Sequence, residues 1–277
     1  MKNYNPQSIL ALRELMPTLP EGTQVLAGGT DWILRYRRRA EEVPALLWLG
    51  GIPELQRITV EGKQLKISAC CTMAMLERSD KLTGAWKMLA EAAASVGSVQ
   101  IRTRATIGGN IANASPAADL AAPLMALDAT AVVLRGGETV ELPVSELIVG
   151  SEQTALGPRD IVLGFSVPAF PQAAEGHYYK LGFREELSIS RFGVAMMLQR
   201  PHGVVERASI AIGAIGARAV RMPAMEQALV GRLVDASAAE ELGALLADYI
   251  RNTSRRQYKA WASRGVMEDA LGLFQPL

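Results

Sequence analysis

Hydrophobic residues recur along the first part of the chain with periods that alternate between helix and strand. Helical spacing predicts an amphipathic helix over 6–16 and a second helix from 32 to about 39. Short apolar runs predict strands over 23–27 and 45–49. The segment 1–55 is therefore predicted to form a small α/β unit.

The middle of the chain carries a denser mixture of elements. The pattern predicts strands over 65–69, 130–134, 139–142 and 161–167, and helices over 72–77 and 84–96. A further helix is expected to begin at Ser115-Pro116, as an N-cap followed by proline, and to end near Asp128. The segment 168–176 contains two prolines and a glycine and is the strongest boundary signal.

Beyond that boundary the pattern changes to longer strands followed by helices. Strands over 178–183, 191–199 and 204–215 are expected to pair as an antiparallel sheet. Helices are expected over 222–229 and 236–251. Together these elements indicate an α+β protein with a separate C-terminal sheet-and-helix unit.

Composition limits the classes of function. The 277 residues are 49% hydrophobic and 21% charged, with a formal net charge of +1, which is typical of a globular protein. Near-zero net charge argues against a general nucleic-acid or membrane-surface binder. No apolar run reaches the roughly 18 to 20 residues of a membrane span, and the N-terminus lacks a signal-peptide core. We expect a cytoplasmic protein without a membrane span or a nucleic-acid partner.

Residues that commonly bind metals are few. The cysteines are Cys70 and Cys71, too few for a four-thiolate cluster or zinc site, and we expect both to be buried in a strand. His177 and His202 have no His or Cys companion at metal-ligand spacing. We therefore predict no metal site.

Two glycine pairs, Gly28-Gly29 and Gly108-Gly109, are the strongest chemical signal. Each follows a β-prone apolar run, at 25–26 and 99–101, and each precedes a predicted helix. Glycine permits positive φ and close approach of a ligand, and consecutive amides beside a helix form an anion site. Two such loops could hold the two phosphates of a dinucleotide, although a tight turn explains either pair alone. Neither G-x-G-x-x-G nor G-x-x-x-x-G-K-[ST] occurs, which disfavours a Rossmann NAD site and a P-loop.

The sequence around both pairs resembles a known family. Residues 25–31 (VLAGGTD) and 106–119 (TIGGNIANASPAAD) are similar to the two FAD-binding loops of the molybdopterin-dependent dehydrogenases, which include the FAD subunits of xanthine and carbon monoxide dehydrogenases. The similarity continues through 160–163 and 179–181 to a basic-aromatic segment at 255–259.

This resemblance implies a vanillyl-alcohol-oxidase-type (PCMH-type) FAD fold of two α/β subdomains with a C-terminal antiparallel domain. The FAD-binding domain would span 1–172, with subdomains of about 1–55 and 56–172, and the C-terminal domain 173–277. We expect no catalytic side chain because the flavin carries the chemistry. The implied FAD-binding residues are Val25, Leu26, Ala27, Gly28, Gly29, Thr30, Asp31, Trp32, Val96, Thr106, Ile107, Gly108, Gly109, Asn110, Asp119, Val162 and Lys180.

Three of these positions carry specific expectations. Asp119 would accept hydrogen bonds from ribityl or ribose hydroxyls, whereas on its own it reads as a first-turn helix acid. Lys180 would place positive charge near the isoalloxazine, whereas on its own it reads as a solvated strand lysine. Trp32 stands where relatives often have an aliphatic residue, and either packs on the flavin or lies in the core.

The resemblance further implies an electron-transfer subunit of a heteromeric enzyme. A large molybdenum-cofactor subunit and a small [2Fe–2S] subunit would deliver electrons to FAD, which passes them to NAD or another acceptor. The alternatives are a self-contained flavin oxidase or reductase, and a non-flavin nucleotide-binding or scaffolding protein. The basic run Arg35, Arg37, Arg38 and Arg39 is either a solvated helix end or a docking surface for an acidic partner.

Overall fold

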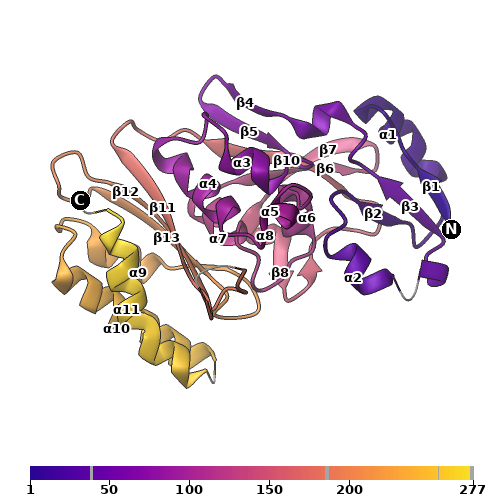
Figure 1. Ribbon diagram of the computed structural model, residues 1–277. Helices are drawn as coiled ribbons and strands as arrows, with labels where there is room; N and C mark the ends of the chain where they lie inside the picture. The colour runs from indigo at the N-terminus through magenta and orange to yellow at the C-terminus, as the bar shows by residue number, and fades with distance from the viewer. Residues whose placement is uncertain (38–39, 185–186, 255, 275–277) are drawn as a thin grey trace.

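A computed structural model describes residues 1–37, 40–184, 187–254 and 256–274. Its larger sheets follow one another along the molecule in chain order (Figure 1). None of the helices in these ranges is long and apolar enough to cross a membrane.

The first sheet is parallel and small. Strands β1 (Lys2–Tyr4), β3 (Ala45–Trp48) and β2 (Gln24–Leu26) lie in that order. Helix α1 (Ile9–Leu15) begins at Ser8, whose side chain accepts a hydrogen bond from Ala11 N–H, and buries Leu12. The remaining short elements are η1 (Met16–Thr18), α2 (Trp32–Tyr36), η2 (Ala40–Glu42) and η3 (Pro53–Gln56).

The second sheet is antiparallel, in the order β4 (Ile58–Glu61), β5 (Gln64–Ser68), β10 (Ile161–Pro168), β6 (Thr130–Arg135), β7 (Glu138–Pro143). Its hydrophobic core includes Phe165 on β10 and Leu124. The helices with this sheet are α3 (Met73–Glu77), η4 (Gly84–Trp86), α4 (Lys87–Ala94), α5 (Val99–Arg102), α6 (Ile107–Ala112), α7 (Ala121–Ala126) and α8 (Val144–Leu147), with a hairpin of β8 (Ile148–Gly150) and β9 (Gln153–Thr154).

The third sheet is covered by helices on both faces. Its antiparallel order is β11 (Ala174–Leu181), β12 (Phe192–Gln199), β13 (Arg207–Gly213), β14 (Val220–Arg221). Helices α4 and α7 contact one face, while α9 (Pro223–Leu229) and α11 (Gln257–Gly272) contact the other and α10 (Ala236–Thr253) packs on both of these helices (Figure 1). Burial from both sides explains the nearly uninterrupted apolar sequence of β12.

Several predicted elements differ from the observed ones. The apolar run at 99–101 is helical in α5, because Ser98 caps it by accepting a hydrogen bond from Ile101 N–H. The helix expected from Ser115-Pro116 begins only at Ala121, because residues 115–120 form turns. Asp119 is therefore not a first-turn helix acid.

The two cysteines are buried as expected, but they lie in the turn after β5 and not in a strand. Cys70 packs in the core of the first sheet and Cys71 in the core of the second. Burial raises the pKa of each thiol to about 12. Helix α11 was not predicted at all.

Candidate functional site

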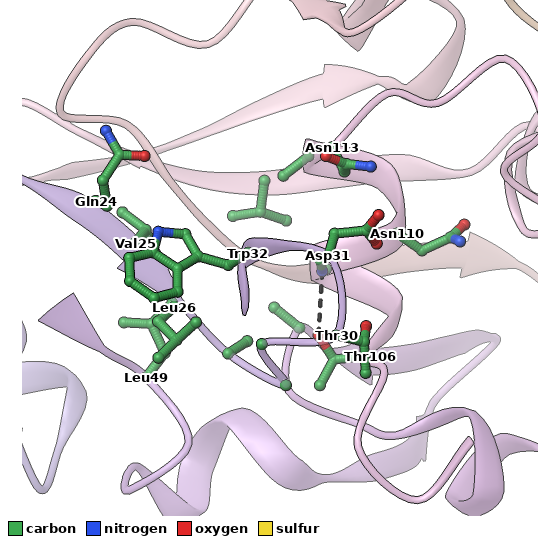
Figure 2. A pocket seen from close by; sticks show the side chains of 18 of the residues that line it. Gln24, Val25, Leu26, Thr30, Asp31, Trp32, Leu49, Thr106, Asn110 and Asn113 are labelled. Atoms are coloured by element: carbon green, nitrogen blue, oxygen red, sulfur yellow. Dashed lines mark hydrogen bonds between the residues drawn. The ribbon is translucent and has the colours of Figure 1, made fainter. Parts of the chain in front are cut away.

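Both glycine loops line one cavity of about 520 Å³, within the size range of ligand sites. It lies between the first and second sheets, bounded by the 23–36 segment, the 105–113 segment and the 154–162 segment (Figure 2). Of the predicted FAD-binding residues it is lined by Val25, Leu26, Ala27, Gly28, Gly29, Thr30, Asp31, Trp32, Val96, Thr106, Gly108, Gly109, Asn110 and Val162.

Close approach of main chains explains two of the glycines. A Cβ on Gly28 would lie 1.8 Å from the Arg104 carbonyl oxygen, so only glycine lets the first loop pack on the segment before the second. A Cβ on Gly108 would lie 2.7 Å from both the Cβ and the carbonyl oxygen of Ala69. Of the four glycines in the two pairs, only Gly29 uses the positive φ that glycine permits, at +77°. Gly108 and Gly109 lie in the first turn of α6, which Thr106 caps.

The two loops differ in the hydrogen bonding of their amides. In the second loop, Ile107 N–H donates to Cys71 O (3.0 Å), Gly108 N–H to Ala69 O (2.8 Å) and Gly109 N–H to Thr106 Oγ1 (3.1 Å). In the first loop, none of the amides of residues 28–32 donates to a protein acceptor in the part of the chain that the structure describes. The amides left without a protein acceptor, and so available to a ligand of this cavity, therefore belong to the first loop.

Trp32 forms an aromatic wall of the same cavity. Its ring stacks on Tyr36, with centroids 5.3 Å apart and planes at 19°. The indole Nε1 is buried and has no hydrogen-bond partner among the described residues. The neighbouring Arg35 pairs with Glu152 at 2.6 Å, which links α2 to the β8–β9 hairpin. Arg37 is exposed, and the predicted docking residues Arg38 and Arg39 lie outside the described residues.

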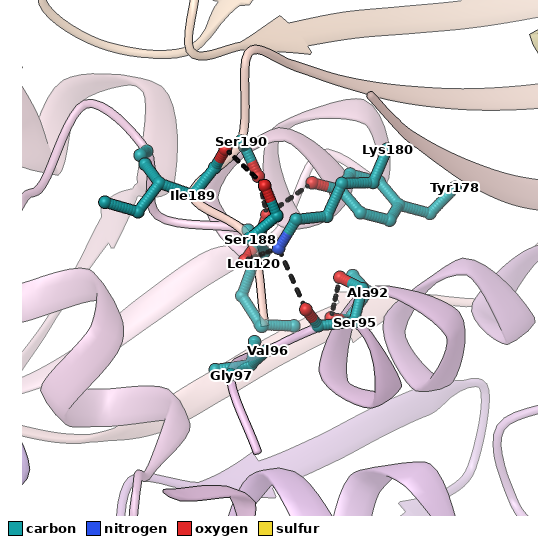
Figure 3. A network of polar contacts seen from close by, with 12 residues as sticks. Ala92, Ser95, Val96, Gly97, Leu120, Tyr178, Lys180, Ser188, Ile189 and Ser190 are labelled. Atoms are coloured by element: carbon teal, nitrogen blue, oxygen red, sulfur yellow. Dashed lines mark hydrogen bonds and ion pairs between the residues drawn. The ribbon is translucent and has the colours of Figure 1, made fainter. Parts of the chain in front are cut away.

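Asp119 and Lys180 do not line the cavity, and they form a largely buried ion pair in a polar network, of which Figure 3 labels Lys180 and its neighbours Tyr178 and Ser190. Lys180 Nζ donates to Asp119 Oδ2 (2.9 Å) and to the Ser95 carbonyl (2.8 Å). Tyr178 Oη and Ser190 Oγ donate to Asp119 Oδ1 at 2.8 and 2.5 Å. Burial, together with the adjacent Asp119 carboxylate, raises the pKa of Tyr178 well above its usual value.

The network reaches the cavity through one peptide bond, because Ser95 precedes Val96 in the cavity wall. Sequence reasoning missed Tyr178 and Ser190. The two-residue period of β11 places Tyr178 on the same face as Lys180, so alternation was a usable signal for it. Ser190 lies in a loop without periodicity, so no sequence pattern pointed to it. Ile107, also predicted to bind FAD, is fully buried in the core.

A second cavity of about 500 Å³, the cationic cavity, lies next to Ser190. It is lined by Arg184, Arg191, Arg256 and Lys259, and no described residue in its wall is acidic. Lys259 Nζ donates to the carbonyls of Arg191 and Ala214. Burial and the two neighbouring arginines, Arg256 and Arg191, lower the pKa of Lys259 to about 8.

Metal-binding groups are scattered in the described residues, where no three His, Cys, Asp or Glu side chains could share a metal ion. His177 Nδ1 instead lies 3.0 Å from Glu91 Oε1.

Comparison with known proteins identifies the class. Residues 1–170 match the family model "FAD binding domain in molybdopterin dehydrogenase", and residues 177–261 match the "CO dehydrogenase flavoprotein C-terminal domain". The chain belongs to this FAD-binding family of molybdopterin dehydrogenases, which are oxidoreductases, and FAD is its cofactor.

Relatives and solved structures agree. The caffeine dehydrogenase subunit beta of Pseudomonas sp. (strain CBB1) is 27% identical over 83% of this chain and 78% of that protein. The carbon monoxide dehydrogenase medium chain of Hydrogenophaga pseudoflava is 28% identical over 83% of this chain and 79% of that one. Reconstituted CO dehydrogenase from Oligotropha carboxidovorans superposes with a TM-score of 0.89 at 25% identity, covering 98% of this chain and 96% of that one.

Structural features of the cavity fit FAD. The unpaired amides of residues 28–32 suit its phosphates. These features are independent of the family match.

Proposed function

We propose that this chain is the FAD-carrying electron-transfer subunit of a heteromeric molybdenum hydroxylase. A large molybdenum-cofactor subunit would oxidise the substrate, and a small [2Fe–2S] subunit would deliver its electrons to FAD. The observation that carries the proposal is the row of unpaired amides at 28–32, in a cavity that adjoins the Lys180–Asp119 pair. Bound FAD supplies the exchange between single-electron and two-electron carriers.

The chain's own residues would bind and orient the cofactor. The amides of 28–32 would hold the phosphates, with the Thr106 and Asn110 side chains across the cavity. Lys180, fixed by Asp119 and the Ser95 carbonyl, would place its positive charge beside the isoalloxazine. Both carboxylate oxygens of Asp119 accept hydrogen bonds from protein donors, so the role of Asp119 would be to position Lys180.

Replacing Lys180 with methionine tests this role. The variant should retain FAD but show a lower reduction potential in a potentiometric titration, because a positive charge near the reduced ring is lost. An unchanged potential would make Lys180 a purely structural residue.

For the electron acceptor we propose NAD. The cationic cavity supports this choice, because its arginines and Lys259 suit the phosphates of an anionic dinucleotide and it adjoins the Asp119 network through Ser190. Another anionic acceptor would satisfy the same charges. Measuring NADH oxidation with an artificial dye, in wild-type protein and in Arg191→Ala, tests the assignment through the KM for NADH.

We place the domain boundary at 172/173, giving an FAD-binding domain 1–172 and a C-terminal domain 173–277, and we place the complex in the cytoplasm. Partner subunits are proposed because both cysteines are buried and free, so electrons must reach FAD from clusters elsewhere.

A pull-down of the tagged protein from its own cells tests the subunit proposal. Molybdenum and iron should be recovered with FAD, and the isolated chain should show at most NADH–dye activity. Recovery of the flavoprotein alone with full substrate turnover would refute the proposal and favour a self-contained oxidase.

A further inference from the structure

The outward face of helix α11 exposes two large aromatic side chains. Trp261 is 82% exposed, the largest exposed fraction among the large hydrophobic residues that the structure describes, and Tyr258 is 61% exposed. Residues three positions apart are neighbours on a helix surface, so both rings lie on one face. The opposite face of α11 packs into the core of the third sheet through Met267 and Ala270. Exposed tryptophan and tyrosine are the residues that most often anchor protein–protein interfaces.

A cavity of about 520 Å³, the elbow cavity, lies beside Trp261 where α10 ends and α11 begins. Ile250 and Ala260, both buried, form its apolar part. Helices α10 and α11 lie at the end of the molecule opposite the first sheet, away from the proposed FAD cavity (Figure 1), so FAD binding does not explain this site. An apolar cavity beside exposed aromatic rings is suited to receive an apolar side chain from another protein.

The charge around the elbow cavity is positive. Arg251 and Arg256 line it, and the residues of its wall that the structure describes include no carboxylate. Arg251 has an exposed ion pair with Asp248 on its own helix, and such surface pairs contribute little to stability. The Arg256 side chain has no hydrogen bond or ion pair within the described part of the chain, and the neighbouring Lys259 is also cationic. Carboxylates of a bound partner would complement these charges.

We propose that the elbow cavity docks an acidic segment of a partner subunit. An apolar side chain of that segment packs against Trp261, and its carboxylates pair with Arg251 and Arg256. The proposal rests on the proposed function, which supplies the partner. It also gives a role to the basic-aromatic sequence at 256–259, which does not line the FAD cavity.

Mass photometry tests the site on the complex purified through a tag on this chain, over a dilution series at several salt concentrations. Trp261→Ala should raise the dissociation constant between this chain and the remaining subunits about thirtyfold, as loss of an aromatic anchor does. Arg251→Ala should raise it about three- to tenfold and reduce its dependence on salt. Arg264→Ala is the matched control on α11, because the Arg264 guanidinium already pairs with Glu240 and Glu268, and it should dissociate like the wild type.

The isolated chain separates docking from folding. Trp261→Ala and Arg251→Ala change exposed side chains, so both should keep the melting temperature and the FAD content of the wild type. Loss of stability or of FAD in parallel with loss of docking would make the elbow a purely structural feature and end the proposal. Arg256 is kept in every variant because it also lines the cationic cavity.

Photo-crosslinking identifies the occupant. The photoreactive residue p-benzoylphenylalanine, placed at Tyr258 one helical turn from Trp261, should crosslink in the native complex to a segment of another subunit rich in Asp and Glu. A crosslink to a basic segment, to a second copy of this chain or to no protein would contradict the proposal. An intact complex in which Trp261→Ala dissociates like the wild type would also contradict it, while leaving the proposed function intact. Recovery of the flavoprotein alone with full substrate turnover would refute the proposed function itself.

Discussion

Two adjacent tyrosines on β11 show how the surroundings of a side chain determine how much its hydrogen bond contributes to stability. Tyr178 is 7% exposed and donates to the buried Asp119, while Tyr179 donates to the exposed Asp269 at 2.6 Å. Losing a donor to a buried carboxylate leaves the charge partly unsatisfied, whereas water replaces the donor at an exposed one.

Tyr178→Phe should therefore lower the free energy of unfolding by about 1–3 kcal/mol. Tyr179→Phe is the matched control and should lower it by about 0.5 kcal/mol or less. Urea denaturation of the cofactor-free protein measures both. Equal effects would mean that the Asp119 network does not stabilise the fold.

Glu91 links α4 to β11 and makes stability depend on acid pH. Burial raises the pKa of Glu91, but hydrogen bonds with His177 and the Tyr178 N–H outweigh it, so the net pKa lies below the ordinary 4.5. The folded state then binds fewer protons than the unfolded state, so the contribution is complete above pH 4.5 and is lost as the pH falls through the folded pKa.

In Glu91→Gln, the free energy of unfolding should fall less steeply below pH 4.5 than in the wild type, and it should be lower at neutral pH. Thermal melts between about pH 3 and pH 7, an interval that covers the titration of carboxyl groups, measure this dependence. Glu175→Gln, on β11 and half exposed, should keep the wild-type pH profile. If the melting temperatures of Glu91→Gln and the wild type fell in parallel with pH, Glu91 would not be the source of the acid dependence.

At the scale of elements, the two glycines of the pair in helix α6 have different surroundings. Gly108 faces the Ala69 backbone, whereas a Cβ on Gly109 would meet only Thr106 Oγ1, at 3.0 Å. The loop lines the cavity, and there Gly108 serves chain packing while neither glycine of the pair has a positive φ.

Gly108→Ala should lower the free energy of unfolding by about 1–3 kcal/mol, as overpacking does. Gly109→Ala should change it by about 1 kcal/mol or less, because alanine's better helix propensity offsets the close contact with Thr106. Urea denaturation distinguishes them. A larger loss at Gly109 would show that the packing of α6 differs from the structure.

Periodicity predicted the elements in which burial follows the sequence pattern. It failed where local or tertiary contacts determined the secondary structure. Strands β5 and β10 and helix α10 follow their patterns closely. Helix α5 has a strand-like composition, but the Ser98 cap stabilises a short helical segment there. In the site, the motif identified the cavity loops, whereas Ser190 reaches Asp119 from 71 residues away, a contact that no local pattern encodes.

At the scale of the whole molecule, the proposed FAD cavity joins elements from two sheets. The first sheet supplies the 23–36 segment and the second supplies α6 and the start of β10. A ligand bound to both sides must stabilise their contact, because it binds only when they are assembled.

FAD should therefore protect the exposed Arg37 from trypsin. At a free FAD concentration 100 times the Kd, cleavage there should slow by about 100-fold if opening releases the cofactor. Cleavage after Arg251, in α10 far from the cavity, should not change. Mass spectrometry of timed digests reads both sites, and equal rates at Arg37 with and without FAD would mean that α2 opens independently of the cofactor.

The adjacent cysteines give this coupling a covalent form. A single peptide bond joins Cys70, in the core of the first sheet, to Cys71, in the core of the second. The backbone at 70–71 therefore joins the two cores covalently, beside the packing of Leu134 and Ile161 of the second sheet in the first core. Because Cys70 also lines the proposed FAD cavity, this covalent junction borders the ligand site itself.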